Sequence, residues 1–408
     1  MATKTKGRFV NGLVDMKAGK ISREIFVNEE IYAEEQEQVF TRAWLFIGHE
    51  SQVPKPGDYF VSGMGEESVI LCRDREGALH VFLNSCRHRG MKVCRYDEGN
   101  TPVFTCPYHG WSYATDGKLV YVAWGDNDEY FLVAHDIRNG KEKWRTQLEP
   151  SLSKHGHGTG TSPVIFEDLV ILLNEHDTGP GYIVALNKNT GKQQWLIKRK
   201  IEIMTYATPI IIEVKGEPVL INSCLDDGLM GINPRNGKVL WSTPGNFDLR
   251  TVAMPVHWNG IVYGSCGAGG KGKLMLAVKV GGKGNVSKSH IAWKRQRSLP
   301  YVPTPIVYGD HIYMWLDNGI VICADPKTGE EIWNERVGRG DFSSSPVCID
   351  GKIYCSSRTG EFTVIKASPK YQLLSRSQLG EATHATPAIS NGRMFLRGFE
   401  KLYCLEAK

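Results

Sequence analysis

Four side chains that commonly bind metals stand close together in the segment CRHRGMKVCRYDEGNTPVFTCPYHGW. Cys86 precedes His88 by two positions, Cys106 precedes His109 by three, and 17 residues separate the two pairs. Each pair therefore places one thiolate and one imidazole on a short loop. Two such loops can hold a [2Fe–2S] cluster, with both cysteines on one iron and both histidines on the other. The iron bound by imidazoles is then the one that accepts an electron, at a raised potential.

Spacing alone leaves two alternatives open at this site. A zinc site can use two Cys and two His, although a zinc finger pairs Cys with Cys and His with His, whereas each loop here mixes them. The four residues could also be unliganded core residues. Gly90 and Gly110 favour the cluster, because they relieve crowding where the backbone must approach the sulfides. Cys94 is predicted to be a small packed residue rather than a redox thiol.

Residues 9–120 resemble the N-terminal part of the α subunit of bacterial aromatic-ring-hydroxylating dioxygenases. The strings that carry the resemblance are AWLFIGHESQVPKPGDYF, NSCRHRGMKVC and CPYHGWSYATDGKLV. It implies a Rieske [2Fe–2S] domain whose ligands are Cys86, His88, Cys106 and His109.

The resemblance also implies an electron-delivering cluster rather than a respiratory one. Respiratory Rieske proteins carry an extra Cys in each loop, joined as a disulfide, where this chain has Met91 and Tyr108. Trp111 replaces a serine that supports the sulfides in that class, which should lower the potential within the Rieske range of roughly −150 to +300 mV. The implied electron donor is a ferredoxin or a reductase. The loops carry a basic rim, either simply solvated or suited to an acidic donor: Arg87, Arg89, Lys92 and Arg95.

A ring-hydroxylating α subunit also needs a mononuclear iron bound by two His and one carboxylate. The family places these histidines five or six residues apart, after an acidic residue. No two of the 12 histidines have that spacing; the closest pairs are His155 with His157, and His80 with His88. We therefore expect an oxidoreductase component without a hydroxylase site of its own, and its status as an enzyme stays open.

The elements expected around the loops are one helix and several strands. Asn28 can cap a helix that opens with Glu29 and Glu30, and an apolar face at helical spacing would include Val39 and Trp44. After residue 57, the strings YFVSG, SVILCR and LHVFLNS predict strands separated by turn residues.

From about residue 118 the sequence repeats. Strands that begin with a proline recur at intervals of 41 to 50 residues: Pro163, Pro209, Pro255, Pro305, Pro346 and Pro387. A second signature reads as a strand, a tight Asx/Gly turn and a strand with a tryptophan that packs on the next unit. It ends at Trp144, Trp195, Trp241 and Trp333, and Trp293 closes a longer version. Four short strands per repeat are typical of β-propeller blades.

These repeats resemble the quinoprotein-like (PQQ-like repeat) propeller family, which includes β-barrel-assembly lipoproteins. The resemblance covers residues 118–408 and implies a mainly β chain: a Rieske domain, one N-terminal helix and a six- or seven-bladed propeller. Quinone-dependent members carry adjacent cysteines over the cofactor. No Cys-Cys pair occurs here, so we expect no PQQ.

The predicted division is an arm with a helix (1–44), a Rieske domain shortened at its end (45–117) and the propeller (118–408). The string DGKLV at the join fits both families. The resemblance to a Rieske domain ends at this point, so its closing strands are expected to be missing, as is the innermost strand of the first blade. We expect cluster removal to unfold residues up to about 117 and to leave the propeller folded.

Composition excludes several functional classes. The chain has a net charge of +5 but lacks the dense basic clusters of a nucleic-acid binder. No run is apolar for long enough to span a membrane. The N-terminus has no apolar signal region, and ten irregularly spaced cysteines indicate a reducing, cytoplasmic setting.

Three functional hypotheses follow. The first is a Rieske-type electron-transfer protein fused to a propeller. The second is a propeller that binds another protein and carries a vestigial cluster site. The third is a full ring-hydroxylating dioxygenase, and the missing mononuclear iron site argues against it. A chimeric sequence with no single function is a further alternative.

Overall fold

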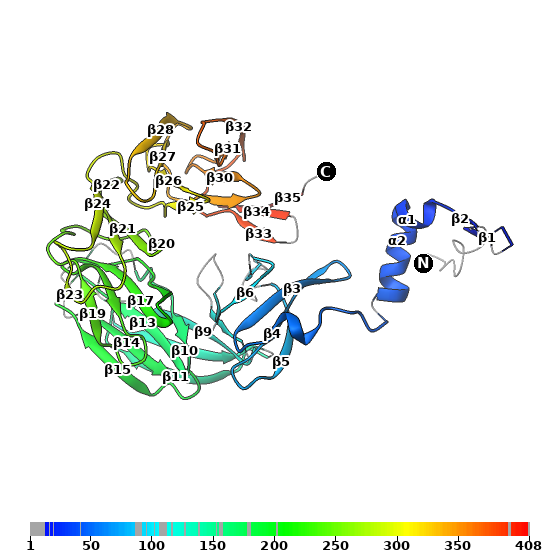
Figure 1. Cartoon of the computed structure of the whole chain (residues 1–408), viewed down its shortest axis with the longest axis horizontal. Helices are drawn as coiled ribbons and strands as arrows, with labels where there is room; N and C mark the ends of the chain where they lie inside the picture. Colours follow the sequence, from blue (N-terminus) through cyan, green and yellow to red (C-terminus); the bar gives the residue numbers. More distant parts are fainter. Residues whose placement is uncertain are drawn as a thin grey trace. The chain divides into compact units, whose positions relative to one another are not determined.

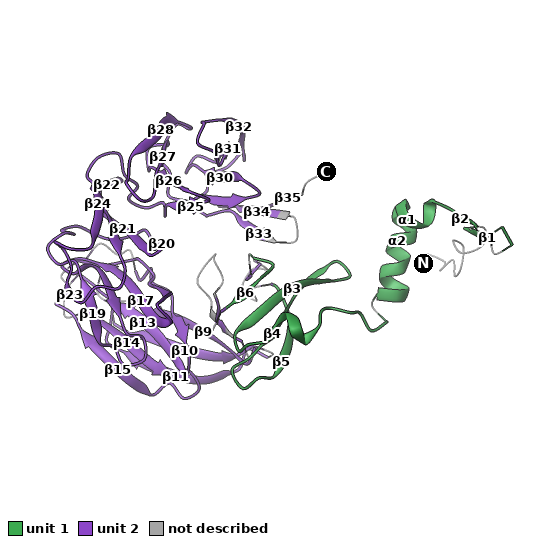
Figure 2. Ribbon diagram, in the orientation of Figure 1, with its two compact units in different colours: residues 1–84, 96–100 green, residues 85–95, 101–408 purple. Residues whose placement is uncertain are grey.

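The structure, a computed structural model, describes residues 13–406 except 16, 19, 41, 86–91, 95, 102, 106–111, 116, 126–127, 138, 152, 155–157, 178–180, 201–202 and 391–392. These residues are mainly β-strand, as predicted. No helix in this part of the chain is long and apolar enough to cross a membrane. The chain divides into two compact units (Figure 2): unit 1 is residues 1–84 and 96–100, and unit 2 is residues 85–95 and 101–408.

The predicted helix forms in unit 1. The Asn28 side chain accepts hydrogen bonds from the backbone N–H groups of Glu30 and Ile31, at 2.9 and 3.2 Å, which confirms its capping role. The predicted apolar face is wrong at its end, because the helical residues stop at Phe40 and Trp44 is fully exposed. The elements of this segment are β1 (Val14–Asp15), β2 (Lys20–Ile21), α1 (Glu24–Val27), α2 (Glu29–Glu35) and the π-helical η1 (Gln36–Phe40).

Unit 1 also contains an antiparallel sheet of four strands in the order β5-β4-β3-β6 (Figure 1). Strand β4 supplies most of its core, since Val69, Ile70, Leu71 and Cys72 are buried. The three strands predicted after residue 57 all form. The elements are η2 (Glu50–Gln52), β3 (Asp58–Met64), β4 (Glu67–Arg73), β5 (Leu79–Leu83) and β6 (Glu98–Asn100).

Unit 2 is a series of sheets in which the strands follow one another in chain order (Figure 1). The first sheet carries the candidate site and is described with it. The second sheet comprises β12 (Val164–Phe166), β13 (Leu169–Asn174), β14 (Tyr182–Asn187) and β15 (Gln193–Lys198). The third comprises β16 (Ile210–Val214), β17 (Glu217–Cys224), β18 (Gly228–Ile232), β19 (Val239–Ser242) and β23 (Gly284–Asn285).

The remaining sheets continue the same pattern. They are β20 (Val256–Trp258), β21 (Ile261–Ala268), β22 (Lys271–Lys279) and β24 (Ile291–Arg295); β25 (Ile306–Tyr308), β26 (His311–Trp315), β27 (Ile320–Ala324) and β28 (Glu331–Arg336); β29 (Val347–Ile349), β30 (Lys352–Ser356), β31 (Glu361–Lys366) and β32 (Leu373–Gln378); and β33 (Ala388–Ser390), β34 (Arg393–Arg397) and β35 (Leu402–Glu406).

The repeated tryptophans pack on the next sheet, as predicted. The Trp144 indole N–H donates to the Lys188 carbonyl at 2.8 Å. The ring lies against Gly191, which has a φ of 71°, and a Cβ atom added there would lie 2.6 Å from the ring. The tight turn therefore requires glycine, both for its backbone angle and for the space that the ring occupies. The same indole bond recurs from Trp195, Trp293 and Trp333 to the carbonyls of Pro234, Pro326 and Ser368.

Candidate metal centre

The predicted ligands belong to two segments of unit 2. Cys86 and His88 belong to residues 86–91, Cys106 and His109 belong to residues 106–111, and both loops lie outside the described residues. The described residues on either side establish where each loop begins and ends.

The second loop closes a hairpin. Strands β7 (Val103–Thr105) and β8 (Ser112–Ala114) are antiparallel, and Thr105 pairs with Ser112. Cys106 follows the last residue of β7 directly, and His109 lies three positions before β8 begins. Strand pairing sets the register of a hairpin, and here it fixes the described residues Thr105 and Ser112, between which Cys106 and His109 lie in the sequence.

This hairpin is part of the first propeller sheet. Ser112 of β8 pairs with Tyr121 of β9, and Tyr113 pairs with Val120. The sheet has the order β11-β10-β9-β8-β7, so β8 takes the position that β12 has in the second sheet, and β7 is added beyond it at the edge. The expectation that the first blade lacks this strand is therefore wrong, because a strand from the Rieske-like segment occupies its place. The other strands of the sheet are β9 (Leu119–Gly125), β10 (Tyr130–Asp136) and β11 (Glu142–Leu148).

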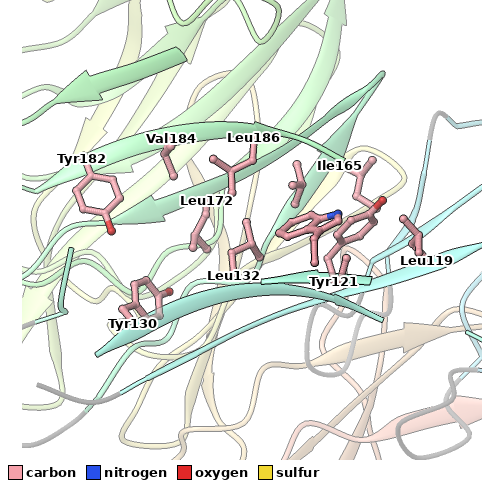
Figure 3. Close-up of a cluster of buried hydrophobic side chains, with 12 residues drawn as sticks. Leu119, Tyr121, Tyr130, Leu132, Ile165, Leu172, Tyr182, Val184 and Leu186 are labelled. Atoms are coloured by element: carbon pink, nitrogen blue, oxygen red, sulfur yellow. The ribbon is translucent and has the colours of Figure 1, made fainter. Parts of the chain in front are cut away.

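Hydrophobic packing joins the hairpin to the propeller core. Phe104 on β7 and Tyr113 on β8 are buried, and Val103 packs against the cluster of buried residues shared by the first two sheets. Strand β12 of the second sheet lies beside both β7 and β8. Figure 3 shows the cluster, which includes Leu119, Tyr121, Tyr130, Leu132, Ile165, Leu172, Tyr182, Val184 and Leu186.

Two buried residues flank the first loop in the sequence. Asn84 follows β5, where its backbone N–H donates to the Ser68 carbonyl at 2.8 Å and its amide donates to Ser68 Oγ at 3.3 Å. Cys94, beyond the loop, is 5% exposed. This burial agrees with a packed residue rather than a reactive thiol. Of the predicted basic rim, the structure describes Lys92, which is half-buried.

The donor set fits a [2Fe–2S] cluster. Two thiols and two imidazoles, one of each on each loop, are the ligand types of a Rieske centre. The pairing of Thr105 with Ser112 holds the two ends of the segment that contains Cys106 and His109 next to each other. Within the described ranges, no group of three or more His, Cys, Asp or Glu could hold another metal ion.

A buried ionic group in the propeller was not predicted. Arg199 Nη1 lies 2.6 Å from Asp227 Oδ2, and Arg199 Nε lies 3.1 Å from Glu175 Oε1. Burial raises the pKa of Glu175 to about 7, although the Arg199 guanidinium opposes this shift. The three residues belong to different connections along the chain, so no local spacing could have revealed them.

Two family models match the chain. The model described as "Rieske [2Fe-2S] domain" matches residues 43–126. The model described as "Outer membrane protein assembly factor BamB" matches residues 88–335. Residues 88–126 fall in both matches and contain β7, β8 and β9, which agrees with a hairpin shared by the two parts.

The curated relatives match only the N-terminal part. "Chlorobenzene dioxygenase subunit alpha" of Cupriavidus sp. (strain PS12) is 50% identical over 115 residues, which are 28% of this chain and 26% of the relative. "Benzene 1,2-dioxygenase subunit alpha" of Pseudomonas putida is 50% identical over 113 residues, which are 28% of this chain and 25% of the relative. The chain thus spans about a quarter of the length of these relatives.

A solved structure matches the propeller fold. BamB from Moraxella catarrhalis aligns with 84% of this chain and 92% of its own, at 14% identity and a TM-score of 0.55. This likeness shows a BamB-like propeller architecture.

Proposed function

This chain belongs to the family described as outer membrane protein assembly factor BamB, whose model matches more than half of its residues, and from that premise we propose that it is a Rieske-type [2Fe–2S] electron-transfer protein with a propeller that supports the cluster. One observation carries the proposal. The hairpin of β7 and β8, which flanks the second ligand segment, forms one edge of the first propeller sheet. A vestigial site would not need such support, whereas a bound cluster requires that its Cys and His ligands are held in place.

In this proposal Cys86 and Cys106 bind one iron, and His88 and His109 bind the other. The cluster, when bound, accepts and releases one electron. The pairing of β7 with β8 would hold the ends of the segment that carries Cys106 and His109. The two imidazoles mark the side where a donor protein approaches.

The partners and boundaries follow from the same proposal. The donor is a ferredoxin or a reductase, which the basic residues of the loops guide to the cluster. The protein works in the cytoplasm and binds no PQQ. Residues 45–117 supply the cluster, and residues 118–408 form six or seven blades, with the β7–β8 hairpin serving both parts. Hydroxylation of a substrate requires another protein that holds the mononuclear iron.

Reconstitution of the full chain tests the proposal. The protein is incubated anaerobically with ferrous iron and sulfide, reduced with dithionite, and examined by electron paramagnetic resonance. We expect a Rieske-type signal from the wild-type chain and its loss in Cys106→Ser. Cys94→Ala is the matched control, since it removes a neighbouring buried thiol and should keep the signal. A wild-type chain without the signal, or a Cys106→Ser chain that retains it, would refute the proposal.

A second candidate function is a protein-binding platform. The family description favours it, because an assembly factor acts by contact with other proteins. The cluster site would then be vestigial. Pull-down partners that remain bound to a Cys86→Ser, His109→Ala double variant would support this function, and partners lost from that variant would favour the electron-transfer proposal.

A further inference from the structure

A groove of about 670 Å³ lies on the third sheet of unit 2. Its volume falls within the range of roughly 300–1,000 Å³ that is common for small-molecule sites. The hairpin between β16 and β17, the turn before β19, and residues 281–283 supply its walls. The lining is largely apolar and includes Val214, Pro218, Val219, Val239, Leu240 and Trp241.

An insertion in the chain builds one wall of this groove. The repeat that ends at Trp293 is longer than the others, and its extra residues include β23. This strand pairs in parallel with β19, through Trp241 with Gly284 and Ser242 with Asn285 (Figure 1). The next residue, Val286, is buried, and its N–H donates to the Ser242 carbonyl at 2.9 Å. These contacts hold residues 281–283 against the third sheet, so the groove has a fixed wall.

The rim of the groove carries unpaired positive charge. Lys215, Lys238 and Lys283 line it and are exposed. None of them lies within ion-pair distance of a carboxylate among the described residues. The one acidic lining residue, Glu217, is already neutralised, because its Oε2 lies 3.1 Å from Arg235 Nη1. Three ammonium groups thus surround an apolar floor without a counter-charge.

We propose that this groove binds a small amphipathic anion, an apolar acyl or aryl body that ends in a carboxylate. The apolar body packs against the floor beside Trp241 and Val239, and the carboxylate lies among the lysines. An extended peptide fits less well, because β23 already occupies the edge of β19 with which a peptide strand would pair. The proposal is independent of the cluster.

Isothermal titration of the full chain with two matched probes tests the assignment. Decanoate carries the proposed anion, and 1,2-decanediol is its uncharged counterpart. We expect decanoate to bind more tightly than the diol. A Lys215→Gln, Lys238→Gln, Lys283→Gln triple variant should weaken decanoate about tenfold, because exposed charge pairs each contribute modestly, and should leave the diol unchanged.

Two further variants make the test specific to the groove. Val239→Trp places a large ring in the groove from a position that is 41% exposed, and it should weaken both probes at least tenfold. Lys288→Gln is the matched control, since Lys288 is exposed in the same insertion but does not line the groove. Overturning results are no decanoate binding, equal losses in the control and the triple variant, or undiminished binding to Val239→Trp. Displacement of decanoate by a polyglutamate peptide at lower concentration would also overturn the small-anion assignment.

Discussion

Tyr113 offers a direct test of whether the propeller and the second ligand loop fold as one unit. This residue lies on β8, is 6% exposed and pairs with Val120 of β9. Replacement of a buried aromatic side chain by alanine typically lowers the free energy of unfolding by about 3–5 kcal/mol. With a urea slope of about 3 kcal/mol per molar, Tyr113→Ala should lower the midpoint of unit 2 by about 1–1.7 M.

Hydrogen exchange in urea, read by mass spectrometry, locates the effect along the chain. Peptides from β9, β12 and β13 should lose protection at lower urea in Tyr113→Ala than in the wild-type chain. Tyr96→Ala is the matched control, since Tyr96 is 76% exposed and exposed substitutions change stability by roughly 0.5 kcal/mol or less. The reasoning is refuted if Tyr113→Ala affects only residues 101–115 and leaves β9 and β12 as protected as before.

Three further predictions concern turn geometry, pH and metal removal. Gly237→Ala should lower the free energy of unfolding by at least about 2 kcal/mol, because φ is 73° and the new Cβ would lie 2.8 Å from the Trp195 ring. Gly260→Ala, at a φ of 75° in open space, should cost only about half as much in the same urea melts. The raised pKa of Glu175, about 7, means that the folded chain binds its proton more tightly than the unfolded chain; stability present below pH 4.5 is therefore lost as the pH rises through 7. The wild-type chain should lose about 1 kcal/mol between pH 6 and 8, and Glu175→Gln should show a flatter profile in urea melts at each pH. Because β8 pairs with β9, the expectation that cluster removal unfolds the chain up to about residue 117 is revised: chelation of a reconstituted cluster should leave the exchange protection of residues 112–115 and 119–125 intact. Melting of these segments on chelation would contradict the shared-sheet architecture.

The repeated part of the fold could be predicted because its signals are local. Each turn places an Asx residue, a glycine and a tryptophan at fixed spacing, and the tryptophan of one turn packs on the glycine of the next, as Trp144 and Gly191 show. The Asn28 cap was likewise predictable, because a cap binds N–H groups only two and three positions away. The candidate ligands could be named for the same reason, since each pair lies within four residues, although their geometry stays a prediction.

The parts that the sequence did not reveal depend on contacts between distant segments. Arg199 meets Glu175 and Asp227 only after the connections of two sheets come together. The predicted end of the helix was wrong for the same reason. The helical spacing of apolar residues continues to Trp44, but Trp44 is fully exposed, so no packing stabilises a last helical turn there. The role of β8 was hidden for a different reason. Its residues match a Rieske loop so well that nothing in them indicates a propeller strand.

The position of the join between the two parts argues for a natural fusion. The shared string DGKLV occupies residues 116–120, so the join falls between β8, which ends at Ala114, and β9, which begins at Leu119. The strand that pairs with β9 must present apolar side chains on the face that is turned toward the core. Phe104 and Tyr113 supply such burial, whereas two unrelated sequences joined by chance would have no reason to do so.

Mass spectrometry of the protein from its native cells tests this argument. Trypsin cuts after Lys118, inside the shared string, and cannot span the join. Cleavage after glutamate yields residues 99–129, since no other glutamate lies between Glu98 and Glu129. We expect this peptide in the native protein, at the same abundance as peptides from either part. Peptides from both parts without the spanning peptide would identify a chimeric sequence. The packing of the β7–β8 hairpin on the propeller would then be a coincidence.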